Sequence, residues 1–184
     1  TKDYKFYTAL GSYRYYKLAA DVADNDYYWG NSVSKGATAD QSFYINDFRG
    51  LYANAGLVFR VGLDKAKIFG SLIQNQDAPT GENTGYLFGA NYETTIKDQK
   101  VILEGLAFRN ESDTAPSFYR ANALSNDYDG FQAGLKIRTA GGFETSIKYT
   151  NRSVIGNQLS VYETGGYSSE QVYSISLRKE YDIL

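Results

Sequence analysis

The sequence contains no cysteine, no methionine and no histidine among its 184 residues. Without cysteine, neither a disulfide framework nor a thiolate metal site can form. Export from the cytoplasm is compatible with zero cysteine, so this absence leaves the compartment open. Because no Met stands at position 1, the chain is expected to be processed or a fragment. Removal of a secretory signal peptide is the simplest explanation.

The absence of histidine restricts the chemistry that the chain could perform. Ser–His and Asp–His pairs cannot be built, and zinc lacks its usual ligands. Ser–Lys and paired-carboxylate sites stay open, but such pairs arise by chance on polar strands. The segment Asp24–Gly30 carries carboxylates, yet it lacks the spacing of a calcium loop, so a plain polar loop is favoured. We therefore expect no enzyme activity, no metal and no cofactor.

Long apolar runs and an excess of basic charge are also missing. No stretch of about 18 apolar residues is present, so a transmembrane helix is excluded and any membrane crossing would use strands. The formal net charge of −2 gives no indication of a nucleic-acid partner.

Tyrosine is the residue that the chain has in abundance, with eighteen copies beside eighteen glycines. Tyrosine combines an apolar ring with a polar tip, which suits a membrane–water boundary. The alternative at this point is a tyrosine-rich soluble β-protein.

Side chains alternate between apolar and polar along most of the chain, which is the period of a β-strand. The clearest stretch runs from Leu51 to Val61, where odd positions are apolar and even positions include Asn54 and Arg60. The same alternation recurs in 86–93, 131–138, 143–150 and 173–183. No segment keeps a helical period for long.

Short and long connections alternate between these stretches. Three are tight, at Gly62–Asp64, near 95–99 and at Ala140–Gly142. Four are long and polar, near 23–41, 75–84, 110–129 and 152–170, and both prolines fall in them. The pattern predicts one domain, 1–184, with eight strands near 4–22, 43–61, 65–74, 85–94, 100–109, 130–139, 143–151 and 171–183. A turn at Gly11-Ser12 would split the first strand, but one long strand preserves the alternation.

An even number of strands with all long loops at one end predicts an antiparallel up-and-down transmembrane β-barrel with short periplasmic turns and long external loops. In lipid the apolar face would point outward, whereas in a soluble barrel it would point inward. Aromatic residues at the ends of the apolar face favour lipid, as in two girdles. These residues are Tyr86, Tyr92, Phe131, Phe143, Tyr149, Tyr173 and Tyr181. Lys179 is a misfit on this face unless its amine reaches the interface.

The polar face carries charges of both signs, and these are the candidate site residues. We expect them to line the lumen: Arg60, Glu93, Glu104, Lys136, Arg138, Glu144, Lys148, Arg178 and Glu180. An eight-stranded barrel is just wide enough to be filled by side chains, so charges inside it must be paired. An ordinary solvated face is the alternative.

The chain resembles the bacterial outer-membrane barrels, both the small eight-stranded kind and the porins. The hairpin Asp129–Thr150 and the strand Gly85–Tyr92 carry the resemblance. Such barrels usually finish on an aromatic residue, whereas this sequence finishes Tyr181-Asp-Ile-Leu184, which leaves the natural C-terminus and the bacterial lineage open. The missing Met also permits a piece of a larger porin. The resemblance implies residence in the bacterial outer membrane.

Three functions follow from these patterns. The first is a small barrel with a structural or surface-interaction role and a lumen filled by charged side chains. The second is a porin-type channel that passes small hydrophilic solutes or ions, either as part of a wider barrel or through an eight-stranded lumen that leaks. The third is a soluble ligand-binding barrel with the opposite orientation. The expected partners are outer-membrane lipid, small solutes and further copies of the chain.

Overall fold

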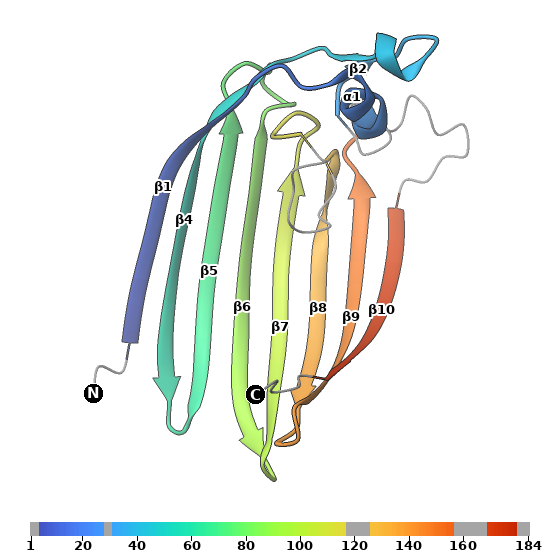
Figure 1. Cartoon of the computed structure of the whole chain (residues 1–184). Helices are drawn as coiled ribbons and strands as arrows, with labels where there is room; N and C mark the ends of the chain where they lie inside the picture. Colours follow the sequence, from blue (N-terminus) through green and yellow to red (C-terminus); the bar gives the residue numbers. More distant parts are fainter. Residues whose placement is uncertain (1–3, 28–30, 117–125, 157–168, 180–184) are drawn as a thin grey trace, which may run out of the picture.

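The computed structural model shows an all-β chain built on one antiparallel sheet of eight strands (Figure 1). The structure describes residues 4–27, 31–116, 126–156 and 169–179, with the backbone alone for 24–27. The sheet consists of β1 (Tyr4–Tyr15), β4 (Phe48–Val61), β5 (Asp64–Asn75), β6 (Thr84–Ile96), β7 (Gln99–Asn110), β8 (Tyr128–Arg138), β9 (Phe143–Val154) and β10 (Ser169–Lys179). The strands lie in that order across the sheet, so the predicted up-and-down connection of neighbours is confirmed.

Tight turns close one end of the sheet at the three predicted places. Gly62 and Gly142 adopt positive φ of 66° and 77°, which glycine reaches without steric cost. Lys97 and Asp98 form the third turn with φ of 48° and 64°. Two consecutive positive φ angles are typical of the hairpin turn whose twist matches that of its strands.

The first two predicted strands are shorter than the alternation suggested. The strand expected over 4–22 ends at Tyr15, because Lys17 takes a positive φ of 52° and α1 (Ala20–Tyr27) follows. The strand expected over 43–61 begins at Phe48 and is preceded by the two-residue β3 (Phe43–Tyr44). Gly11 lies inside β1 and pairs with Tyr52, so one uninterrupted strand forms there, as expected.

The segment expected as a plain loop over 23–41 contains regular structure. Helix α1 covers its start, the two-residue β2 (Val33–Ser34) pairs with β3, and the 3₁₀ turn η1 (Ala39–Gln41) lies between them. Asp24–Tyr27, expected in a polar loop, are thus helical, and 28–30 lie outside the described residues. No helix within the described ranges is long and apolar enough to cross a membrane.

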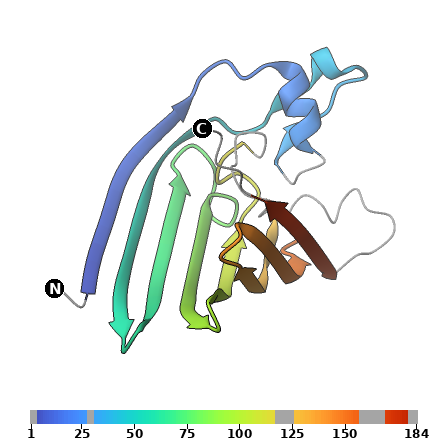
Figure 2. The same ribbon diagram turned by 60° about the horizontal axis from the view of Figure 1, so that its bottom comes forward.

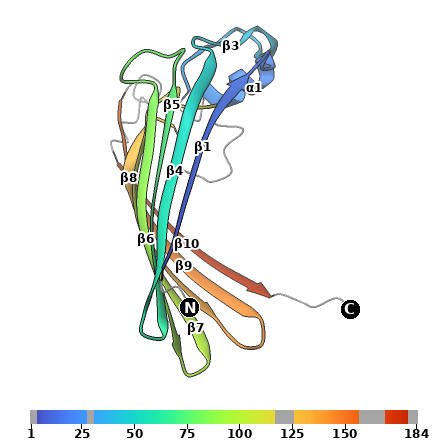
Figure 3. The ribbon, with the colours of Figure 1, turned by 90° about the vertical axis from the view of Figure 1, so that its left-hand side faces the viewer.

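The sheet is open rather than closed into a ring. β1 pairs with β4 on one side and β10 pairs with β9 on one side, and no pairing between β1 and β10 is present in the described strands. The two lie at opposite edges in Figure 1. The sheet is nevertheless curved, and α1, β2 and β3 form a cap on its concave side at one end (Figures 2 and 3).

Most of the buried apolar side chains lie at this capped end. The buried hydrophobic residues among those described are Ala23, Val33, Phe48, Ala78, Phe108 and Ala115. By contrast, twenty-four large hydrophobic side chains of the described residues are exposed, most of them on the strands. Over most of their length the described strands therefore lack a hydrophobic core, and they are held together by backbone pairing with their neighbours.

Candidate functional site

The two faces of the sheet differ in composition and in exposure. On β6, Tyr86, Phe88 and Tyr92 are exposed. Leu87, Asn91 and Glu93, which alternate with them, are half-buried and point to the other side of the sheet. We call the first side the apolar face and the second, which the cap covers at one end, the concave face.

The predicted lumen residues lie on one face, as the alternation indicated. Eight of the nine are on the concave face of described strands: Arg60, Glu93, Glu104, Lys136, Arg138, Glu144, Lys148 and Arg178. Glu180 lies outside the described residues. The shared face follows from strand register, because the side-chain period of 2 is maintained through every pairing.

Ion pairs on the concave face connect neighbouring strands. Lys100 Nζ lies 3.1 Å from Glu93 Oε1 across β7 and β6. Lys136 Nζ lies 3.7 Å from Glu104 Oε1 across β8 and β7, with both side chains about one-third exposed. Arg138 Nη2 lies 2.6 Å from Glu144 Oε2 across the β8–β9 turn. The described charges therefore lie along the wall of the curved sheet.

The apolar face forms a continuous surface over all eight strands. Among its exposed members are Leu10, Leu51, Leu72, Phe88, Leu103, Phe131, Ile147 and Ile175. On β8, β9 and β10 the rings of Phe131, Tyr149 and Tyr173 contact one another in sequence, edge to face at a centroid distance of 5.8 Å and then tilted at 5.0 Å. Soluble monomers rarely expose a contiguous apolar surface of this kind.

Charged residues on the apolar face lie at its two ends. Arg49 and Arg109 lie towards the capped end, and Asp64 lies at the turn end. Lys179, the predicted misfit, is the last residue of β10, and its amine is 4.6 Å from the centroid of the Phe143 ring. The middle of the face is free of charge on the described strands.

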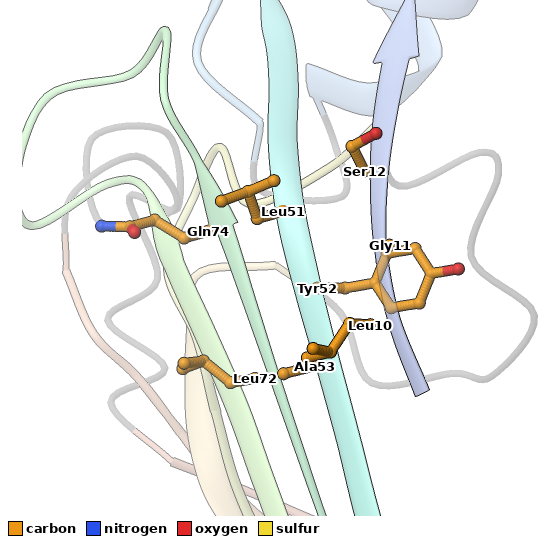
Figure 4. Close-up of a pocket in the computed structure, with 8 residues that line it drawn as sticks. All are labelled: Leu10, Gly11, Ser12, Leu51, Tyr52, Ala53, Leu72 and Gln74. Carbon is orange, nitrogen blue, oxygen red and sulfur yellow. The ribbon is translucent and has the colours of Figure 1, made fainter. Parts of the chain in front are cut away.

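A shallow apolar hollow lies on this face where β1, β4 and β5 meet (Figure 4). Its lining residues are Leu10, Gly11, Ser12, Leu51, Tyr52, Ala53, Leu72 and Gln74. Ala53 lies between Leu10 and Leu72 in the register of the three strands, and its side chain is smaller than theirs. The lining offers no pair of charged groups, so it suits an apolar chain better than a polar solute.

Tyrosine rings cover glycines on the concave face of β1 and β4, a relationship that the sequence reasoning missed. The Tyr7 ring lies over Gly56, Tyr13 over Gly50 and Tyr52 over Gly11, each within 3 Å of where a Cβ would stand. Each pair comes from adjacent strands in register. The sequence signal was the recurrence of Tyr and Gly at alternate positions, but only the register brings them together.

The cap is fastened by a buried polar cluster around Asp113, which was also missed. Asp113 Oδ1 accepts from the Ser32 backbone N–H at 2.8 Å, and its Oδ2 accepts from the Asn46 amide at 2.6 Å. Asn75 of β5 donates to the Asp113 carbonyl at 2.9 Å. Burial raises the pKa of the Asp113 carboxyl above its ordinary value, although these donors favour the charged form.

Two further contacts connect the loop that follows β7 to distant parts of the chain. The hydroxyl of Tyr13 on β1 donates to the Thr114 carbonyl at 2.5 Å. The Asn31 amide donates to the Ala115 carbonyl at 3.1 Å. A segment that sequence reasoning treated as a plain long loop is thus a structural connector between the cap and the sheet.

Metal chemistry has no visible basis within the described ranges. No group of three or more acidic, histidine or cysteine side chains there could hold an ion.

Comparison of the chain with models of protein families, with curated proteins and with solved structures finds no match.

Proposed function

We propose that the chain forms the wall of a β-barrel in a bacterial outer membrane, with its apolar face against lipid. The observation that carries this proposal is the reversed exposure of the strands. Leu103 and Ile147 are half-exposed at 51% and 50%, while their polar neighbours Glu104 and Lys148 are less exposed in the same strands. Lipid accepts such a surface and water does not.

The dimensions of the apolar face support the same proposal. On β4 it runs from Leu51 to Val61, between Arg49 at one end and Asp64 opposite Val61 at the other. Ten residue steps of about 3.3 Å span about 33 Å along the strand. With the tilt of about 40° usual in membrane barrels, this is about 25 Å across the bilayer, the height of their apolar band.

Membrane residence also requires that the open edges find partners, because unpaired backbone groups are costly in hydrocarbon. β1 and β10 run in opposite directions, so their free edges can pair in the antiparallel manner of the other seven interfaces. We propose that they close an eight-stranded ring in the membrane.

Cysteine crosslinking tests this closure in a chain that has no cysteine of its own. One cysteine replaces Thr8 of β1. A second cysteine replaces, in a series of variants, each residue of β10 from 172 to 176 in turn. Closure predicts a disulfide at one or two alternate positions, and the pair at Thr8 and Ala55, which are opposite each other, is the positive control. Failure at all β10 positions, with the control oxidised, would contradict closure.

A single substitution tests the lipid contact. Leu103→Arg places a charge on the apolar face, and Leu106→Arg places the same group on the concave face of the same strand. In vesicles Leu103→Arg is expected to lower the free energy of unfolding by about 2–4 kcal/mol near mid-bilayer. On a water-exposed surface the same change would stay within about 0.5 kcal/mol. An unchanged stability for Leu103→Arg would overturn the proposal.

A second candidate function is a porin-type channel for small hydrophilic solutes. It is favoured by the ion pairs, which join adjacent strands and so lie along the wall. A lumen plugged by side chains would use pairs that reach across it. Steady conductance steps in planar bilayers are expected from a channel, and a membrane-inserted protein without steps would exclude it.

The remaining alternative, a soluble ligand-binding barrel, requires the apolar side chains to be covered by the chain itself. The described strands leave Leu10, Phe88 and Ile175 more than 60% exposed. A protein that stays soluble and monomeric in detergent-free buffer would support this alternative.

A further inference from the structure

Basic residues dominate the part of the concave face that lies towards the tight turns. The nine basic side chains there are Lys5, Arg60, Lys65, Lys67, Lys100, Lys136, Arg138, Lys148 and Arg178. The three acidic side chains are Glu93, Glu104 and Glu144. Positive charges therefore exceed negative ones by six on this part of the described strands, although the whole chain has a net charge of −2.

The acids on this surface are already engaged with bases of the same surface. Glu93 pairs with Lys100, Glu104 pairs with Lys136, and Glu144 pairs with Arg138. The excess of six positive charges is independent of how these pairs form. Neutralising that excess therefore requires anions from outside the described strands.

Acidic residues at the capped end do not supply the missing charge. Arg49 pairs with Asp77 there, and Arg152 pairs with Glu170. Arg109 lies between Glu111 and Asp129, at 3.7 Å and 3.4 Å. These acids have local basic partners, and they lie at the opposite end of the strands from the turns.

We propose that the turn-side half of the concave face is an anion pathway, so that the solutes of the proposed channel are small anions. This inference rests on the channel function proposed above. Rings of Lys and Arg are a known basis of anion selectivity, because they raise the local concentration of anions and lower that of cations. A local potential of about one kT per unit charge raises the local concentration of a monovalent anion about threefold.

The experiment measures the reversal potential of the reconstituted full chain in planar bilayers under a KCl gradient. Chloride is expected to be at least about threefold more permeant than potassium at 0.1 M salt. The preference should weaken at 1 M, where the screening length falls from about 10 Å to about 3 Å.

A charge-reversed variant and a matched control locate the selectivity. Lys67→Glu combined with Lys148→Glu lowers the excess from six to two and is expected to remove most of the chloride preference. Lys17→Glu combined with Lys35→Glu makes the same change in net charge at the capped end, outside the strands, and is expected to preserve it.

Each outcome separates this inference from the functions on which it rests. Conductance steps with potassium preference, or with no preference at low salt, would overturn the anion pathway and leave the channel in place. Protein that inserts, as shown by protection from protease, but gives no steps would overturn both the channel and the pathway. Protein that does not insert would overturn the membrane proposal as well.

Discussion

The side-chain amide of Asn46 donates a hydrogen bond of 2.6 Å to the Asp113 carboxylate, and this bond joins positions that are 67 residues apart. Asn46 lies two residues before β4, and Asp113 lies three residues after β7. Ser32, next to β2, donates its backbone N–H to the same carboxylate. One buried acid therefore ties three segments of the cap together.

Asp113→Ala is expected to loosen the cap, because the Ser32 N–H and the Asn46 amide lose their buried acceptor. Hydrogen bonds to a charged group contribute about 1.5–3 kcal/mol, so the cap should lose stability by about that amount. Denaturant titration of a fluorophore attached at position 35 measures the change. Asp113→Asn keeps one acceptor oxygen and should cost less. Equal losses in the two variants would contradict the role of the carboxylate as acceptor.

The stability of the cap is expected to fall as pH rises above about 4, the ordinary pKa of an aspartate. Burial raises the pKa of Asp113, so the folded cap retains the Asp113 proton to higher pH than the unfolded cap. Stability from this group is thus present at low pH and is lost as pH rises through the raised pKa. The difference between wild type and Asp113→Asn, measured with the same fluorophore, isolates this contribution from that of other carboxylates. A difference that does not vary with pH would contradict the raised pKa.

A glycine whose added Cβ would clash with a neighbouring backbone should tolerate substitution by alanine less well than a glycine with open space beside it. A Cβ on Gly50 would stand 2.0 Å from the Gln74 carbonyl, which is backbone and cannot turn aside. Gly50→Ala is expected to destabilise the sheet by about 1–3 kcal/mol. Gly105→Ala meets nothing within 4 Å and should be neutral or stabilising. Equal unfolding free energies in vesicles would mean that the strands at Gly50 lie farther apart.

The ion pair between Glu104 and Lys136 should contribute little to stability. Both side chains are about one-third exposed, and pairs of this kind contribute about 1 kcal/mol or less. A double-mutant cycle with alanine at both positions measures the coupling. A loss of about 3–5 kcal/mol from one substitution alone would instead indicate a lumen filled by side chains, in which the remaining charge is buried.

The eight strands could be predicted from the sequence because most of them alternate with a period of 2, and because short and long connections alternate between them. The same period placed the charged residues from Arg60 to Arg178 on one face. The alternation of side chains does not indicate where strand pairing stops. The predicted first strand therefore extends beyond Tyr15 into α1, a short helix without a long apolar repeat.

Contacts between distant segments could not be predicted in this way. Asp113 lies in a polar loop whose composition resembles that of other loops, and its burial depends on Ser32 and Asn46 reaching it. The covering of Gly56 by Tyr7 depends on the register between β1 and β4. The proposed closure likewise depends on two edges, β1 and β10, that no local sequence pattern connects.

The lipid contact of the apolar face can be measured at two adjacent positions of β9. A nitroxide spin label is placed on a cysteine at Ile147 or at Lys148 in the chain reconstituted into vesicles, and its collisions with oxygen and with a water-soluble nickel complex are compared. We expect the label at Ile147 to meet oxygen preferentially and the label at Lys148 to meet the nickel complex. Equal access of the nickel complex to both labels, or the reverse order, would contradict a lipid-facing apolar surface.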